Sequence, residues 1–459
     1  MRRRLLPLLL VALAACASDS NDARPDEPVD AEAGTSGQQV DDGAAPTGGD
    51  RPLPDEPELA TDLSDRPGRL LVYEFENEER PLSVYSPNGE TIAALPVTAG
   101  TAAWLPSWSP SGEWVVWAES PDNQTWVAAR ARPGSDDRDE VVLPGRPDHL
   151  AFAPSEDVVY LLTPAPGGFG LFSADFASPG EPREIDLGVP YFSDVGPTGD
   201  LLTHAGAETR VVTPDGTGSV LDDSGAGYQT PLWLADGHTV VYSRRLGIEE
   251  GSMNELVLHD LSNDEVRSLA HYRRFVFFAL DPGSERLAVA VFGRPPAARF
   301  QTQEVRAVGP TATGTDELPQ ADTAELSTGL WLVPLDGSDP EQLSEEPSGA
   351  PSWDPTGEWI VARSTVGGTG EWRAHADDGR VRSSPAHTIG ERGVSVYYLQ
   401  FWDQYSRTQT IWAPDGSAYA YPALSGSGAA HIWIHDLATG ESLALAPGSM
   451  AFWAPDPPR

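Results

Sequence analysis

Apolar and polar residues follow one another along this chain in a strand–turn–strand pattern that is clearest at residues 106–117. The segment PSWSPSGEWVVW runs from an apolar stretch ending at Trp108, through the polar stretch 109–112, into a second apolar stretch. Pro at the second position of the turn presets φ, and Gly at the fourth position tolerates a positive φ. The pattern predicts a hairpin whose second strand is buried on both faces.

The same phrase returns along the chain, most clearly as PSWDPTGEWIVA at residues 351–362 and TIWAPDGSAYAY at residues 410–421. Weaker copies lie elsewhere. The residue that ends the first strand of each copy, here called the anchor, occurs eight times, as Trp108, Phe152, Val195, Trp233, Leu280, Trp353, Trp412 and Trp453. The separations are 44, 43, 38, 47, 73, 59 and 41 residues. Most of them match one four-stranded propeller blade, and the two long ones require insertions.

Further strand and turn signals lie between the anchors, for example LWLVPLDG at residues 330–337. One repeat therefore consists of four antiparallel strands. We predict an all-β fold, a single β-propeller of eight blades, with seven as the alternative. Trp453 begins a repeat that the chain does not complete, whereas residues 68–95 supply the later strands of a repeat without an anchor. Pairing these two ends would close the ring and remove its open edges.

The anchors at residues 108–112, 353–357 and 412–416 read Trp-Ser-Pro-Ser-Gly, Trp-Asp-Pro-Thr-Gly and Trp-Ala-Pro-Asp-Gly. They resemble the WD40-like repeat of the TolB propeller and of the propeller domains of prolyl-oligopeptidase-type peptidases. The resemblance covers about residues 67–459. It implies a propeller fold and no particular function, because such repeats occur in scaffolds, binding proteins and enzymes alike. The anchor tryptophans are expected to fill the wedges between blades rather than to stack on a ligand.

The first sixteen residues, MRRRLLPLLLVALAAC, have three arginines, an apolar run and small residues before a cysteine. This pattern is typical of a secretion signal that is too short to remain as a membrane span. The stretch 13–16, LAAC, resembles the lipobox of bacterial lipoproteins, which implies that Cys16 is lipidated and that residues 1–15 are removed. Residue 17 is Ala. We therefore expect the outer membrane in a host with two membranes, and the outer face of the plasma membrane in a host with one.

Residues 17–66 contain 14 acidic residues, three arginines and no aromatic residue. Such a segment cannot bury enough apolar surface to fold, so residues 16–66 are predicted to be a lipidated, disordered tether before the propeller at 67–459.

The whole chain has a formal net charge of -39, which disfavours binding to the phosphate backbone of nucleic acid. Cys16 is the only cysteine, so no disulfide is expected within the chain.

Residue patterns for catalysis are mostly missing from the sequence. No Gly-x-Ser-x-Gly elbow, His-Glu-x-x-His motif or Gly-rich phosphate loop occurs, and we predict no catalytic residue, no cofactor and no metal site. His431 and His435 would share one face of a strand, where a structural role is favoured over zinc. A propeller enzyme acting on a glycan or small molecule needs only a few carboxylates in the central funnel, so this alternative stays open.

The two insertions are the stretches that blade construction leaves unexplained. Residues 293–329 are rich in Pro, Gly and Thr, which favours a mobile loop, whereas residues 390–409 mix aromatic and charged side chains. In the second insertion, Trp402, Tyr405 and Arg407 are the candidate partner contacts, because aromatic and Arg residues are enriched where proteins bind one another. Replacing all three by Ala is then expected to weaken binding and leave folding intact. Burial of Tyr397, Tyr398, Phe401 and Trp402 against a blade is the alternative.

These observations favour a lipid-anchored envelope protein whose propeller is a non-catalytic module that binds a protein, a peptide or a glycan. The alternative is a propeller enzyme with its site in the funnel. A deep pocket with converging carboxylates would favour the enzyme, and a flat aromatic face would favour binding.

Overall fold

The computed structural model describes residues 67–74, 82–189, 191–225, 229–247, 253–293, 323–366, 369–388, 398–425 and 428–455. The predicted signal sequence, Cys16 and the acidic tail lie outside the described residues, as do residues 294–322 of the first insertion and 390–397 of the second. Among the described residues, no helix is long and apolar enough to span a bilayer.

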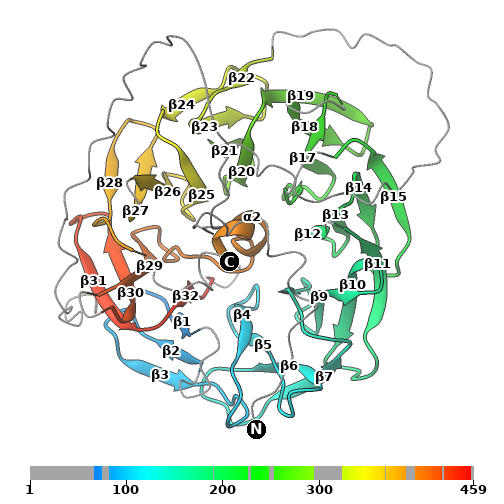
Figure 1. Cartoon of the computed structure of the whole chain (residues 1–459), viewed down its shortest axis with the longest axis vertical. Helices are drawn as coiled ribbons and strands as arrows, with labels where there is room; N and C mark the ends of the chain where they lie inside the picture. Colours follow the sequence, from blue (N-terminus) through cyan, green and yellow to red (C-terminus); the bar gives the residue numbers. More distant parts are fainter. Residues whose placement is uncertain are drawn as a thin grey trace, which may run out of the picture. The chain divides into compact units, whose positions relative to one another are not determined.

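The described residues form eight sheets arranged as the blades of a β-propeller, as the sequence predicts (Figure 1). We number the blades along the chain from the first complete one.

Blade 1 consists of β4 (Trp104–Trp108), β5 (Val115–Glu119), β6 (Trp126–Ala131) and β7 (Asp139–Leu143). Blade 2 consists of β8 (His149–Phe152), β9 (Val158–Ala165), β10 (Gly168–Asp175) and β11 (Arg183–Gly188). Blade 3 consists of β12 (Tyr191–Val195), β13 (Leu201–Ala205), β14 (Glu208–Val212) and β15 (Gly218–Asp222). Blade 4 consists of β16 (Leu232–Trp233), β17 (Thr239–Arg245), β18 (Asn254–Asp260) and β19 (Glu265–Tyr272), with β22 (Glu325–Leu326) as an added fifth strand. Blade 5 consists of β20 (Phe275–Leu280), β21 (Arg286–Phe292), β23 (Gly329–Pro334) and β24 (Glu341–Ser344). Blade 6 consists of β25 (Ser348–Trp353), β26 (Trp359–Val366), β27 (Thr369–Ala376) and β28 (Val381–Ser383). Blades 7 and 8 consist of β29 (Ala418–Leu424), β30 (Ala430–Asp436) and β31 (Ser442–Pro447); and β32 (Met450–Trp453), β1 (Leu70–Tyr73), β2 (Ser83–Tyr85) and β3 (Thr91–Ala94).

Seven of the eight predicted anchors are the last residue of the innermost strand of a blade, including the weak copies Phe152, Val195 and Leu280. In blade 7 the anchor Trp412 forms a single bridge with Tyr419 in place of a full strand. The predicted turn is confirmed in blade 1, where the Gly112 N–H donates to Ser109 O at 2.9 Å and Gly112 has a φ of 70°. The hydrophobic pattern therefore located every blade.

The ring closes through the two ends of the chain, as predicted. In blade 8 the strand β32 pairs antiparallel with β1, in a register that places Leu71 opposite Phe452 and Leu70 opposite Trp453. In Figure 1 these strands, red and blue, lie side by side. Phe452 and Trp453 are fully buried, so closure also completes the packing between the first and last blades.

The anchor tryptophans are buried, and three of them also join blades by hydrogen bonds. The indole N–H of Trp108 donates to Phe452 O at 3.0 Å, that of Trp353 to Ala279 O at 3.1 Å, and that of Trp412 to Ser352 O at 3.2 Å. Each acceptor immediately precedes the anchor of the preceding blade. An innermost strand has a neighbour on one side only, so the indole satisfies a carbonyl group that the sheet leaves free.

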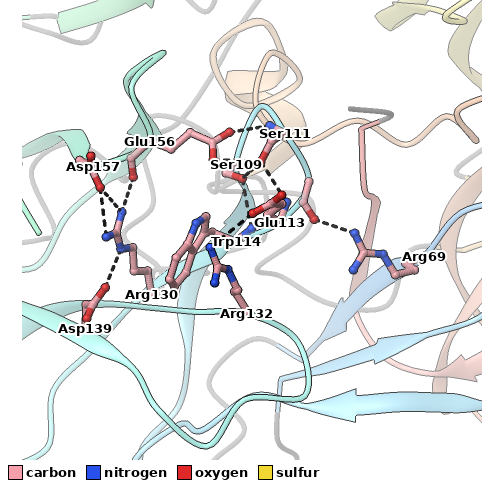
Figure 2. Close-up of polar contacts among 11 residues, drawn as sticks. Arg69, Ser109, Ser111, Glu113, Trp114, Arg130, Arg132, Asp139, Glu156 and Asp157 are labelled. Carbon is pink, nitrogen blue, oxygen red and sulfur yellow. Dashed lines mark hydrogen bonds and ion pairs between the residues drawn. The ribbon is translucent and has the colours of Figure 1, made fainter. Parts of the chain in front are cut away.

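The anchor turn of blade 1 ties three consecutive blades together (Figure 2). The Ser111 N–H and hydroxyl donate to the Glu156 carboxylate, in the anchor turn of blade 2, at 2.6 and 2.9 Å. On the other side, Arg69 of blade 8 donates to Gly112 O at 2.7 Å. A Cβ at Gly112 would lie 2.7 Å from Pro455 O, so the positive φ and the close approach both require glycine here.

The arginine Arg130 of blade 1 forms a second link to blade 2 (Figure 2). Its guanidinium lies 4.5 Å from the centre of the Trp114 ring and 4.7 Å from that of Phe176, and it forms ion pairs with Asp139 and Asp157 at 3.0 and 3.2 Å. A buried guanidinium with two carboxylates and two aromatic faces is well compensated for its loss of water.

The antiparallel order of the strands assigns each loop to one of two faces. The anchor turns all lie on one face, here called the turn face. The loops between second and third strands, and the connections from one blade to the next, lie on the opposite face, here called the connection face. The strand ends that flank both insertions point to the connection face, because β21 and β23 are the second and third strands of blade 5 and β28 is the last strand of blade 6.

Candidate functional site

Residues 398–410, which comprise the described part of the second insertion and the residue after it, lie on the propeller axis and are here called the axial segment (Figure 1). It contains the 3-10 turn η2 (Leu399–Phe401) and the single helical turn α2 (Trp402–Tyr405). Tyr398, Trp402 and Tyr405 follow one another at helical spacing and pack together. The rings of Tyr398 and Tyr405 stack with centroids 5.8 Å apart, and Tyr398 meets Trp402 edge-on at 5.1 Å.

Side chains of the axial segment bind the main chain of blades 6, 2 and 3. The Trp402 indole N–H donates to Pro351 O at 2.8 Å, and the Tyr405 hydroxyl donates to Asp148 O at 2.5 Å. The Gln404 amide binds Ser193 twice, accepting from its N–H at 2.9 Å and donating to its carbonyl at 2.7 Å. Gln404 thereby pairs with the free edge of β12 as one residue of an additional strand would.

The C-terminal half of the axial segment binds blades 1 and 8. Gln409 donates to Pro106 O at 2.9 Å, and the Ser107 hydroxyl donates to Thr408 O at 2.9 Å. The Trp453 N–H donates to Thr410 O at 2.9 Å. The helical turn α2 also packs against β20 of blade 5. The segment therefore serves as a hub for the innermost strands around it.

Buried ionisable groups surround the hub. The Asp403 carboxylate accepts from the Thr230 N–H of blade 4 at 2.6 Å, while its other oxygen has no hydrogen-bond partner. Burial raises the pKa of Asp403 to about 6. Arg407 donates to Asp403 O at 2.9 Å and lies 3.5 Å from the Asp194 carboxylate, whose pKa burial also raises. Burial lowers the pKa of the neighbouring His149 to about 4.

The structure brings the three candidate contact residues together, but in the interior. Trp402 is 1% exposed and Tyr405 is 7% exposed, and the Arg407 side chain is 16% exposed. This burial agrees with the alternative for Tyr398 and Trp402, namely packing against the blades. Partner binding by these side chains stays a prediction, and Tyr397 lies outside the described residues.

A signal for this burial was present in the sequence, because residues 398, 402 and 405 have the i, i+4, i+7 spacing of one buried helix face. The polar contacts had no such signal. Gln404 and Asp403 bind backbone groups more than 170 residues away.

The two histidines considered for zinc lie on β30 and bind nearby oxygen atoms. His435 is buried and its Nδ1 lies 2.9 Å from the Ser442 hydroxyl, and burial lowers its pKa to about 4. His431 lies nearer the surface, with Nδ1 3.3 Å from Ala429 O. Within the ranges that the structure describes, no group of three His, Cys, Asp or Glu residues could hold a metal ion.

A cavity of about 530 Å³ opens on the connection face between blades 4 and 5, and is here called the rim pocket. Its polar lining includes Arg273, Arg274, Glu325, Thr328, Gln342 and Glu345. The first two residues belong to the connection between β19 and β20. The sequence drew attention to the insertion that ends beside this cavity, but not to these residues.

The chain resembles solved propeller structures at low sequence identity. The dihydro-heme d1 dehydrogenase NirN, solved in complex with DHE, is 12% identical with a TM-score of 0.54, over 87% of this chain and 79% of that one. These likenesses concern the fold. The oligogalacturonate lyase of Vibrio parahaemolyticus is 10% identical with a TM-score of 0.44, over 76% of this chain and 85% of that one. TolB of Acinetobacter baumannii is 13% identical with a TM-score of 0.36, over 71% of this chain and 67% of that one. No protein-family model and no curated protein matches the sequence.

Proposed function

We propose that the protein is a lipid-anchored envelope protein whose propeller binds a protein, a peptide or a glycan through its connection face and does not catalyse a reaction. The observation that carries this proposal is the axial segment. A propeller enzyme needs reacting groups that a substrate can reach along the axis, whereas Trp402, Gln404 and Tyr405 occupy that position and bind the blades themselves. A cavity of about 530 Å³ lies instead at the rim of the connection face.

One observation favours an enzyme as the second candidate. Asp403 has a pKa near 6, and so does Asp148, again because of burial. A carboxyl group with such a pKa can serve as a general acid near neutral pH. The position of Asp403 argues for a structural role, since Asp403 is only 2% exposed and accepts a hydrogen bond from the Thr230 N–H.

Two measurements on the full chain separate the candidates. We expect the immobilised full chain to capture a specific partner from envelope extracts, and we expect a screen of glycan and peptide substrates to show no turnover. Turnover that is lost in Asp403→Asn, while the melting temperature is retained, would replace the binding proposal by the enzyme. Absence of both capture and turnover would leave neither candidate supported, and the binding proposal would fail.

The lipid anchor gives a separate prediction. We expect Cys16 to carry the lipid, because the stretch 13–16 resembles a lipobox and Cys16 is the only thiol in the chain. The wild-type chain should incorporate a labelled fatty acid and sediment with membranes. Cys16→Ser should incorporate no label and leave the membrane fraction. If Cys16→Ser is still labelled and still sediments, Cys16 is not the lipidation site.

A further inference from the structure

We infer that the rim pocket binds a short extended peptide segment that carries both a carboxylate and a cationic group. This inference deepens the proposed binding function and rests on it. It assigns a site and a class of ligand that the propeller fold by itself does not specify.

The walls of the rim pocket are held in place by main-chain pairing and by side-chain hydrogen bonds to main-chain carbonyl groups. The end of the first insertion forms β22, which pairs parallel with the edge of β19, with His271 opposite Glu325 and Tyr272 opposite Leu326. The indole N–H of Trp331 then donates to Ser327 O at 2.9 Å, and the Gln342 amide donates to Thr328 O at 3.1 Å. The pocket is therefore built before any ligand arrives, which lowers the entropic cost of binding.

The charges of the pocket divide into a satisfied pair and an unsatisfied pair. Arg273 Nε lies 2.9 Å from Glu325 Oε1, so these two charges compensate each other. Arg274 and Glu345 are both exposed, and their side chains make no ion pair or hydrogen bond with any other described residue. One cation and one anion thus line the same cavity without partners.

This arrangement selects for a ligand that presents both signs of charge. A carboxylate can bind the Arg274 guanidinium in a bidentate manner, and an ammonium or guanidinium group can bind Glu345. A ligand with carboxylates alone, such as a uronic acid oligosaccharide, would satisfy Arg274 but would meet repulsion from Glu345. The net charge of -39 adds to that repulsion at long range.

The sheet edges around the pocket favour a peptide over other ligands that carry both a positive and a negative group. The strands β22 and β24 are the outermost strands of blades 4 and 5, and each contributes residues to the lining. The outer edge of such a strand presents N–H and C=O groups that an extended peptide can pair with. The volume of 530 Å³ lies within the usual range for ligand pockets, and an extended tripeptide is about 10 Å long.

The test is calorimetric titration of the full chain with tripeptides whose termini are blocked. The probes are Lys-Thr-Glu, the neutral Gln-Thr-Gln and the acidic Glu-Thr-Glu, with a digalacturonate as the sugar arm. We expect Lys-Thr-Glu to bind most tightly. Arg274→Gln and Glu345→Gln should each weaken its binding about tenfold, which equals about 1.4 kcal/mol. The matched control is Arg183→Gln, an exposed arginine on the outer strand β11 of blade 2, which should bind as the wild type does.

Three outcomes would overturn the inference. The first is no binding of Lys-Thr-Glu, and the second is binding of Lys-Thr-Glu by Arg274→Gln or Glu345→Gln as tight as by the wild type. The third is tighter binding of the digalacturonate or of Glu-Thr-Glu than of Lys-Thr-Glu. The extract experiment keeps this failure separate from failure of the proposed function. If both variants capture the same envelope partner as the wild type, the protein is a binding module whose site lies elsewhere. If the wild type captures no partner and binds no probe, both proposals fail.

Discussion

Deleting residues 448–459 is expected to abolish the cooperative folding of the whole ring. The deletion removes β32, the innermost strand of blade 8, and with it the buried side chains of Met450, Phe452 and Trp453. Each large buried apolar side chain contributes about 1.5–3 kcal/mol, so their sum approaches the 5–15 kcal/mol that typically stabilises a domain. The deletion also removes the carbonyl group that accepts from Trp108. Thermal unfolding followed by near-UV circular dichroism measures the effect.

A milder variant keeps this prediction testable if the truncated chain does not fold at all. Phe452→Ala should destabilise the protein by about 3–5 kcal/mol, because it leaves a cavity between blades. The matched control is Ile92→Ala on β3 of the same blade, where the side chain is 50% exposed and the expected change is within about 0.5 kcal/mol. A truncated chain that melts at the wild-type temperature would show that pairing of the two ends contributes nothing to stability.

Among single substitutions in the axial segment, Trp402→Ala is expected to lower the free energy of unfolding most, by about 3–5 kcal/mol. The substitution leaves a cavity at the axis, beside the Trp372 ring at 5.4 Å, and it leaves Pro351 O without the indole donor. The unfolding free energy from denaturant titration should fall accordingly, with the m-value unchanged.

The control for Trp402→Ala is Trp126→Ala. Because Trp126 on β6 is only half-buried, its replacement by Ala should lower the free energy of unfolding less. The hypothesis that Trp402 is an exposed partner contact makes the opposite prediction, namely weaker partner capture with normal stability. If Trp402→Ala retains the wild-type unfolding free energy, the described packing of the axial segment is wrong.

The candidate site was only partly predictable from the sequence. The aromatic spacing in residues 398–405 carries the signature of a buried face, but periodicity does not state which surface covers that face. The partners are backbone groups such as Pro351 O and Ser193 O, which have no signature of their own in the sequence. The contact interpretation for Trp402 and Tyr405 rested on composition, and composition alone does not distinguish a buried aromatic residue from an exposed one.

The sequence by itself determined the blades of this protein. Anchor, turn and strand recur at intervals of 38–47 residues except across the two insertions. Each of these signals is local, since Pro and Gly set the dihedral angles of a turn and alternating burial sets the faces of a strand. The closure between β1 and β32 was also predictable, because two incomplete repeats can complete only one blade.

The tertiary structure alone decided how the ring is filled and where it is open. The axial segment takes its place because the innermost strands around it leave carbonyl and amide groups that need partners, and its side chains supply them. The rim pocket arises because the first insertion returns to the edge of β19 and brings Arg274 and Glu345 to one cavity from positions 71 residues apart in the chain. Such long-range contacts depend on the assembled ring, and no local pattern of hydrophobic and polar residues encodes them.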